Sequence, residues 1–112
     1  MTDTVNTPYT LIENLSDLMG AIKPESIISH TFYKDDGMKA ILFGFDVGQE
    51  LSEHTSNQTA IIQIVQGDAT VMLGDDKHEL TAGSWIHLPA RLKHGIFAKT
   101  PLIMLLLMLS AE

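Results

Sequence analysis

The sequence predicts an all-β domain, a barrel or sandwich of antiparallel strands with one short N-terminal helix. Short apolar runs recur about every 8–12 residues, with Gly, Pro, Asn and Asp between them. The runs have the length of strands, and several alternate apolar with polar residues. At 112 residues, the chain is long enough for one domain with its own core and too short for two.

The N-terminal region differs from the rest in composition. Residues 1–10 are rich in Thr, Asn and Asp, which predicts an arm, and residues 11–112 are expected to form the single domain. Apolar residues at helical spacing then predict a helix of roughly two turns, which Asn14 can cap and Gly20 can end. A helix this short would serve as a lid or plug.

Everything after residue 27 has the pattern of strands and turns, and eight or nine strands are expected. The clearest runs cover residues 28–33, 38–46, 60–65, 69–73, 77–80, 84–88, 94–98 and 102–109.

Charge and composition exclude several function classes. The net charge is −7, and the seven basic residues are scattered, so no patch exists to neutralise a run of phosphates. Nucleic-acid binding is therefore not expected. The absence of cysteine removes disulfides, thiolate metal sites and cysteine nucleophiles.

No membrane partner is expected either. The N-terminus has neither a basic region nor an apolar core of the kind found in secretory signals. The longest apolar run, residues 102–109, is far shorter than the roughly 20 residues needed to span a bilayer as a helix. The sequence predicts a cytoplasmic protein.

Two stretches, residues 48–67 and 83–98, each open with a glycine and carry one well-placed histidine, His54 and His94. Their spacing resembles the paired motifs of the cupin superfamily, small jelly-roll barrels (RmlC-like) that enclose a ligand or metal site. The resemblance implies a single-domain cupin double-stranded β-helix.

The first cupin motif is Gly, five residues, His-x-His, three or four residues, Glu, six residues, Gly. Gly48, His54 and Gly67 match it with the correct spacing. Ser56 stands where the motif has its second histidine, and Ala60 stands where it has the glutamate.

The second motif is Gly, five residues, Pro-x-Gly, two residues, His, three residues, Asn. Gly83, Pro89 and His94 match it. Arg91 replaces the second glycine, and Ala98 replaces the asparagine.

The resemblance also bears on metal binding. Metal-binding cupins use both histidines and the glutamate of the first motif and the histidine of the second, so only His54 and His94 remain as ligands here. Stable sites use three or four protein donors. No tightly bound cofactor is expected, and at most a weakly held divalent metal such as Fe, Ni, Mn or Zn.

Strand alternation predicts the wall of a barrel cavity. The Ser and Ala replacements make this cavity roomier and more apolar, which suits a small, partly apolar molecule. The expected lining residues are His54, Ser56, Gln58, Ala60, Ile62, Ile64, His94, Ile96 and Ala98. Glu53, next to His54, should point to the opposite face. His87 shares a strand face with Trp85 and should be a surface or inter-subunit residue, not a third ligand.

Three functions remain open. The leading one is a binding module for a small molecule, without catalysis and with no catalytic residue assigned. The second is a metal-dependent dioxygenase or isomerase whose two-histidine site is completed by substrate or water. The third is a dimeric scaffold with a vestigial pocket.

The stretch 102–109 is apolar at every position, which predicts a strand with both faces buried. One face can line the barrel. The other face would be exposed to water unless another part of the protein packs against it. The expected cover is a second copy in a two-fold homodimer, as in other small cupins, and the N-terminal segment is the alternative.

Overall fold

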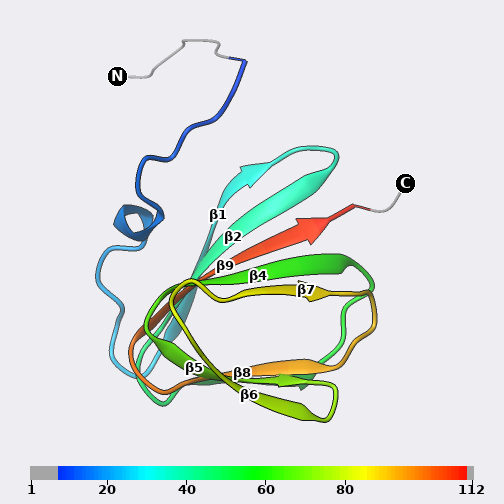
Figure 1. Cartoon of the computed structure of the whole chain (residues 1–112). Helices are drawn as coiled ribbons and strands as arrows, with labels where there is room; N and C mark the ends of the chain where they lie inside the picture. Colours follow the sequence, from blue (N-terminus) through cyan, green and yellow to red (C-terminus); the bar gives the residue numbers. More distant parts are fainter. Residues whose placement is uncertain (1–7, 111–112) are drawn as a thin grey trace.

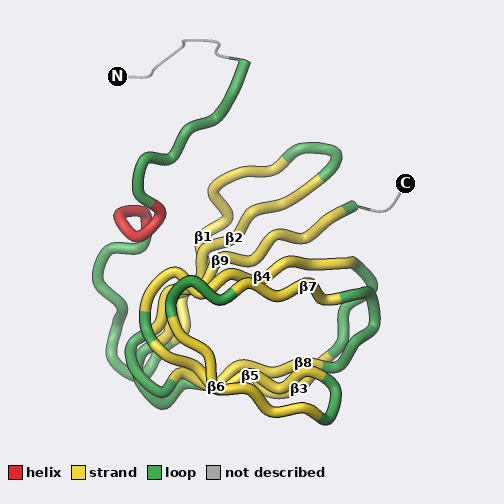
Figure 2. Tube along the Cα trace, in the orientation of Figure 1, coloured by secondary structure: helices red, strands yellow, loops and turns green. Residues whose placement is uncertain are grey.

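The structure is a computed structural model that describes residues 8–110 of the chain. Within these residues, two antiparallel sheets face each other in a jelly roll, as expected (Figures 1 and 2). One sheet has the order β1-β2-β9-β4-β7 and the other the order β3-β8-β5-β6. The strands are β1 (Ile27–Lys34), β2 (Met38–Phe45), β3 (Glu50–His54), β4 (Thr59–Gln66), β5 (Asp68–Leu73), β6 (Asp76–Thr81), β7 (Trp85–Leu88), β8 (His94–Ala98) and β9 (Leu102–Leu109).

Eight of these strands coincide with the stretches that the sequence predicts as strands, and β3 does not. Its sequence is Glu-Leu-Ser-Glu-His, and only Leu51 is shielded from solvent along it. A strand with one apolar residue leaves no periodic signal. The strand β6 also has only one, but the hairpin turn at Gly74 and Asp75 marks it in the sequence. The strand β3 forms because β8 pairs with it, which is a tertiary contact.

The N-terminal helix is shorter than expected. It is a single 3-10 turn, Leu15–Leu18, and the side chain of Asn14 caps it by accepting a hydrogen bond from the amide of Ser16 (3.0 Å). Gly20 adopts a φ of 67°, which ends the turn. The prediction of two turns is therefore wrong, because the chain turns at Met19 to bury that side chain against the sheet.

Residues 8–26 run beside the outer face of the five-stranded sheet (Figure 1). Of the expected arm, residues 8–10 are exposed, and the remainder lies outside the described residues. No helix within residues 8–110 is long and apolar enough to cross a membrane.

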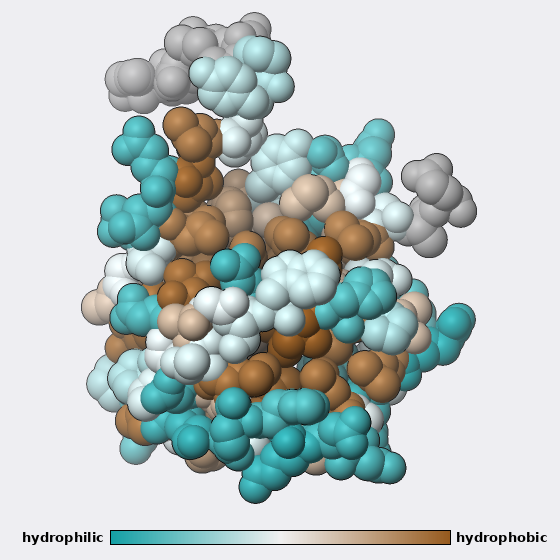
Figure 3. All heavy atoms as spheres, in the orientation of Figure 1, coloured by the Kyte–Doolittle hydropathy of each residue, from teal (hydrophilic) through white to brown (hydrophobic). Residues whose placement is uncertain are grey.

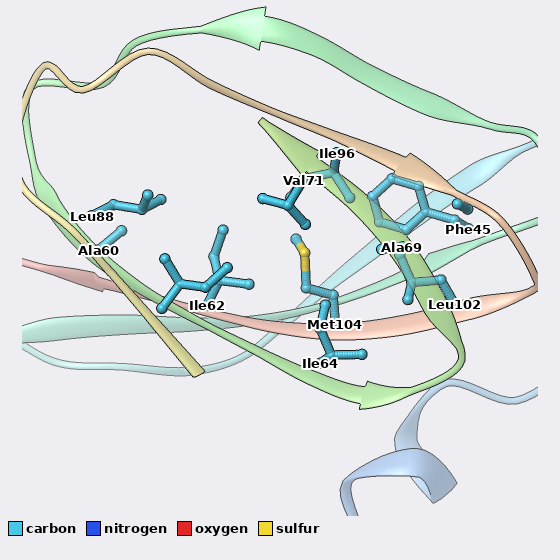
Figure 4. Packing of buried hydrophobic residues seen from close by; sticks show 12 residues of the cluster. Phe45, Ala60, Ile62, Ile64, Ala69, Val71, Leu88, Ile96, Leu102 and Met104 are labelled. Carbon is cyan, nitrogen blue, oxygen red and sulfur yellow. The ribbon is translucent and has the colours of Figure 1, made fainter. Parts of the chain in front are cut away.

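The space between the two sheets is filled with apolar side chains from both (Figure 4). Ile62 and Ile64 of β4 and Met104 of β9 come from one sheet, and Val71 of β5 and Ile96 of β8 come from the other. Each is at most 3% exposed. These side chains fill the middle of the barrel.

Candidate functional site

The two histidines of the motifs lie side by side near one end of the barrel. His54 ends β3 and pairs directly with His94, which begins β8. Their ring centroids are 4.4 Å apart, and the rings are tilted by 55°. The sequence predicted that both would face one cavity, and the structure brings them together.

A β-bulge in β3 turns His54 toward the barrel. From Leu51 to His54 the chain advances three residues, while the partner strand advances only two, from Ile96 to His94. Leu51 packs on the core, so strict alternation would turn Glu53 inward next. The extra residue shifts the alternation, so that His54 lines the cavity and Glu53 the outer face, as the sequence predicted.

Gly95 leaves room for this bulge. A Cβ atom at Gly95 would lie 3.2 Å from both the carbonyl oxygen of Leu51 and the Cγ atom of Glu53. Such contacts are tight, so a side chain at this position would push the bulged strand back by a few tenths of an ångström, and glycine avoids that shift. Sequence reasoning missed Gly95, although a glycine directly after the motif histidine was a signal of close backbone approach.

A hydrogen bond of the same kind determines which nitrogen of each imidazole ring carries the proton. Nδ1 of His54 lies 2.9 Å from the carbonyl oxygen of Ser52, and Nδ1 of His94 lies 2.9 Å from that of Leu92. A carbonyl oxygen only accepts, so each neutral ring carries its proton on Nδ1. Each Nε2 is then left as a hydrogen-bond acceptor.

These acceptors are accessible. His94 is only 9% exposed, and its Nε2 makes no hydrogen bond within the described residues. No side-chain polar atom in that part of the chain is both fully buried and without a partner. The Nε2 atom of His94 must therefore reach solvent.

The space next to the imidazoles is a small cavity of about 60 Å³. It holds five of the nine residues that the sequence placed in the wall: His54, Ser56, Gln58, Ala60 and His94. The other four, Ile62, Ile64, Ile96 and Ala98, lie in the closed core. Alternation puts them on the correct face, but opposing side chains such as Val71 and Met104 fill the space in front of them.

The rest of the wall was not predicted. It consists of Leu88, Pro89, Leu92, Leu106 and Met108. Leu106 and Met108 follow Met104 by alternation along β9, so the strand pattern contained a signal for them. Leu92 lies in the loop before β8, where no periodicity exists.

Three hydrogen bonds hold the polar rim. The amide of Arg91 donates to the carbonyl oxygen of Ser56 (2.7 Å), which joins the loops that precede β4 and β8. Nε2 of Gln58 donates to the carbonyl oxygen of Leu109 (3.3 Å), and its backbone amide donates to Oγ of Ser56 (3.2 Å). The Oε1 atom of Gln58 remains as an acceptor on a residue that lines the cavity.

The backbone of Arg91 is strained where its amide bonds to Ser56, because its φ is 72°. A left-handed residue with a Cβ atom costs about 1–2 kcal/mol, and the cupin motif has glycine at this position. Arg91→Gly should therefore raise the free energy of unfolding by up to about 1 kcal/mol, since glycine gains chain entropy when unfolded and offsets part of the relief. Urea unfolding measures this, and a loss of stability would contradict the account of strain.

The donor set does not fit a tightly held metal. Of the four positions that bind metal in the motifs, His54, Ser56, Ala60 and His94, all line the cavity, but only the two histidines are ligands. Within residues 8–110 no group of three or more His, Cys, Asp or Glu side chains is arranged to hold a metal ion. The side chain of Glu53 points away from the cavity, and its Oε1 lies 3.8 Å from Nζ of Lys93.

The class of protein follows from this geometry, two facing antiparallel sheets with paired histidines beside a cavity. The family model of the cupin domain matches residues 41–109, and the chain belongs to the cupin family. The comparison with curated proteins gave no match.

Solved structures share the fold. A conserved Streptococcus pyogenes protein of unknown function is 24% identical, with a TM-score of 0.81 over 100% of this chain and 97% of that one. A cupin superfamily protein from Desulfitobacterium hafniense is 25% identical, with a TM-score of 0.80 over 97% of both chains. KdgF from a Halomonas species is 23% identical, with a TM-score of 0.74 over 82% of this chain and 86% of its own.

Proposed function

We propose that this cupin binds a small organic molecule by its hydrogen-bond-donor end, at the paired imidazoles and without a tightly held metal. The observation that carries the proposal is the shared tautomer: both Nδ1 atoms are committed to backbone carbonyls, so both Nε2 atoms accept. Gln58 Oε1 adds a third acceptor on the rim.

The lining of the cavity supports a donor over an anion. No Lys or Arg side chain lines it, so no cation offsets the repulsion between a bound carboxylate and the acceptor atoms. Convergent acceptors instead match a hydroxyl, an amide or an ammonium group. The apolar part of the wall, which includes Ala60, Leu88, Leu106 and Met108, suits a short hydrocarbon next to that group.

The volume of the cavity limits the size of the ligand group that can enter it. About 60 Å³ corresponds to the liquid volume of about two water molecules. Whole small-molecule sites occupy roughly 300–1,000 Å³. The cavity therefore takes the end group of a ligand, and the remainder of that ligand lies across the mouth near His54, which is exposed.

Two fragments of similar size test this directly. Propylamine, a cationic donor, should bind at pH 8, where ordinary imidazole side chains are neutral, with a Kd on the order of 1 mM. Propionate should bind at least about tenfold more weakly, since it has no proton to donate. Both are followed by the ¹⁵N resonances of the histidine rings.

His94→Phe keeps a ring of similar size but removes an acceptor, and should weaken propylamine binding about tenfold. His87→Phe is the matched control, because His87 is an exposed histidine on the outer face of β7, as the sequence predicted. Binding of propionate as tightly as propylamine would contradict the proposal. Binding of neither fragment would favour a scaffold with a vestigial pocket.

A metal-dependent enzyme is the second candidate, favoured by the two free Nε2 atoms on adjacent rings. It would need substrate or water to supply the remaining ligands. Metal content after loading with Fe, Ni, Mn or Zn and desalting separates the two functions. Stoichiometric metal that is lost in both His54→Ala and His94→Ala would support the enzyme, whereas complete loss on desalting supports the binding module.

A further inference from the structure

A second hollow, of about 170 Å³, adjoins the imidazole cavity. Gln58 and Met108 line both spaces, so the two meet at these side chains. The other residues that line the second hollow are Lys34, Asp35, Met38, Lys39 and Ser110. The uncharged cavity therefore has a neighbour that carries charged side chains.

The strand register puts the two lysines on the face of the sheet that lines the barrel. Directly paired residues share a face, and one row of pairs crosses all five strands of this sheet. The row is Lys34, Lys39, Met108, Ala60 and Leu88. Its last three members line the imidazole cavity. The wall of that cavity thus continues across β2 and β1 as a pair of cations.

Lys39 ends an otherwise apolar face of β2. Alternation places it on the same face as Phe43 and Phe45, which pack in the core between the sheets. Figure 1 shows the tip of the β1–β2 hairpin at the upper right, away from the four-stranded sheet at the bottom. None of the described residues that line the second hollow belongs to that opposite sheet. The space in front of Lys39 therefore stays open.

Neither lysine of the hollow is neutralised by an ion pair. The ion pairs within residues 8–110 are those of Lys93 and Lys99, and neither Lys34 nor Lys39 forms one. Lys39 is nevertheless half-buried. A half-buried ammonium group without a carboxylate partner favours the binding of an anion from solution.

Among the described residues, Asp35 is the one acid that lines the hollow, and its carboxylate is bonded within the hairpin. Its Oδ1 accepts from the amides of Gly37 (2.8 Å) and Met38 (2.9 Å), and its Oδ2 accepts from the hydroxyl of Tyr33 (2.6 Å). The hydrogen bond from Tyr33 is the largest cause that lowers the pKa of Asp35, so the group is ionised at neutral pH. Two lysines and one carboxylate leave the hollow with one net positive charge.

The two spaces are separated by a distance that a short chain can span. Ala60 and Lys39 lie two strands apart in the same row, which corresponds to roughly 10 Å between their backbones. The apolar side chain of Met108 lies between them. A molecule whose end group sits at the imidazoles therefore needs several methylene groups over Met108 to bring its other end to Lys39.

From these observations we infer that the ligand of this cupin carries a carboxylate at the end opposite its donor group, and that Lys39 and Lys34 bind this carboxylate. The inference rests on the proposed function, because the imidazoles hold the other end. One net positive charge matches a single carboxylate, and each ammonium group can donate to its oxygens. The ligand class is that of ω-amino acids and their hydroxy and amide counterparts.

Compounds that differ only at the far end test this class. 6-Aminohexanoate is hexylamine with a carboxylate in place of the terminal methyl group. At pH 8, where lysine is charged, it should bind about fivefold more tightly than hexylamine, the gain expected for an ion pair near the surface. β-Alanine is too short for the span and should bind no more tightly than its matched amine, propylamine. The ¹⁵N resonances of the histidine rings follow all four titrations.

Substitutions then locate the carboxylate. Lys39→Met keeps an apolar side chain and removes the charge, so the two longer compounds should bind with equal Kd values. An unchanged Kd for hexylamine in this variant shows that its fold is intact. Lys34→Met should remove part of the preference. Lys77→Met is the matched control and should retain all of it, because Lys77 lies on the outer face of the four-stranded sheet, where hydrophilic residues gather at the bottom of the view (Figure 3).

The possible failures are distinguishable. Equal Kd values for hexylamine and 6-aminohexanoate in the wild type would overturn the inference and leave the proposed function standing. A preference that the double variant Lys34→Met with Lys39→Met retains would also overturn it, since the carboxylate would then be bound elsewhere. If neither compound shifts the histidine resonances, the proposed function fails, and this inference fails with it.

Discussion

Replacing Gly67 by alanine is expected to cost on the order of 4 kcal/mol of stability, a large share of what holds a domain of this size together. Gly67 turns β4 into β5 with a φ of 95°. A Cβ atom there would collide with the carbonyl oxygen of Pro101 and lie 2.9 Å from Oγ1 of Thr100. The backbone before β9 must then shift, in addition to the strain of the left-handed φ.

Gly83→Ala separates these two effects. Gly83 has almost the same φ, 97°, but nothing lies within 4 Å of its missing Cβ atom. Its replacement should therefore cost only the conformational strain, about 1–2 kcal/mol. Urea unfolding of both variants gives the comparison. Equal losses of unfolding free energy in the two variants would contradict this account, because they would show that the contact with Pro101 does not require glycine at position 67.

Restoring the two missing ligands should create a metal site. Ser56→His with Ala60→Glu puts an imidazole and a carboxylate into the cavity that already holds His54 and His94. Going from two to four protein donors should raise the affinity for Zn²⁺ or Ni²⁺ at least about 1,000-fold, since losing even an outer-shell partner typically costs about 10–100-fold. Calorimetric titration measures the gain.

The free energy of unfolding of this double variant should depend on whether metal is bound. Ala60 is only 5% exposed, so the new carboxylate is buried, and without metal the variant should be less stable than the wild type. Metal at 1,000 times its Kd should then add about 4 kcal/mol to the unfolding free energy. The matched control is Ser56→His with Ala60→Gln, which has nearly the same shape as the Glu variant and lacks its carboxylate. Equal Zn²⁺ affinity in the wild type and the Glu variant would contradict this account of the site.

Much of the fold was predictable because its signals are local. Glycines such as Gly67 and Gly74 mark turns with positive φ, and the apolar runs between turns have strand length. The strand β3 and its bulge carry no local signal. They depend on pairing with β8 and on the small size of Gly95, which are contacts between segments distant in the sequence.

The candidate site was predictable in part for the same reason. The resemblance to the paired cupin motifs placed His54 and His94 together, and alternation gave the inward face of β4. Alternation states which way a side chain points, but not whether the space in front of it is filled. Ile62 and Ile64 face inward as expected and meet the side chains of the other sheet, so the open volume shrinks to the barrel end.

Native mass spectrometry of freshly purified protein tests most directly whether the paired imidazoles hold an organic donor and not a metal. The wild type should carry an organic adduct with a hydroxyl, amide or amine group, and His54→Ala and His94→Ala should lose it. A mass increase of one divalent metal ion, or an organic adduct that both variants retain, would contradict the proposed function.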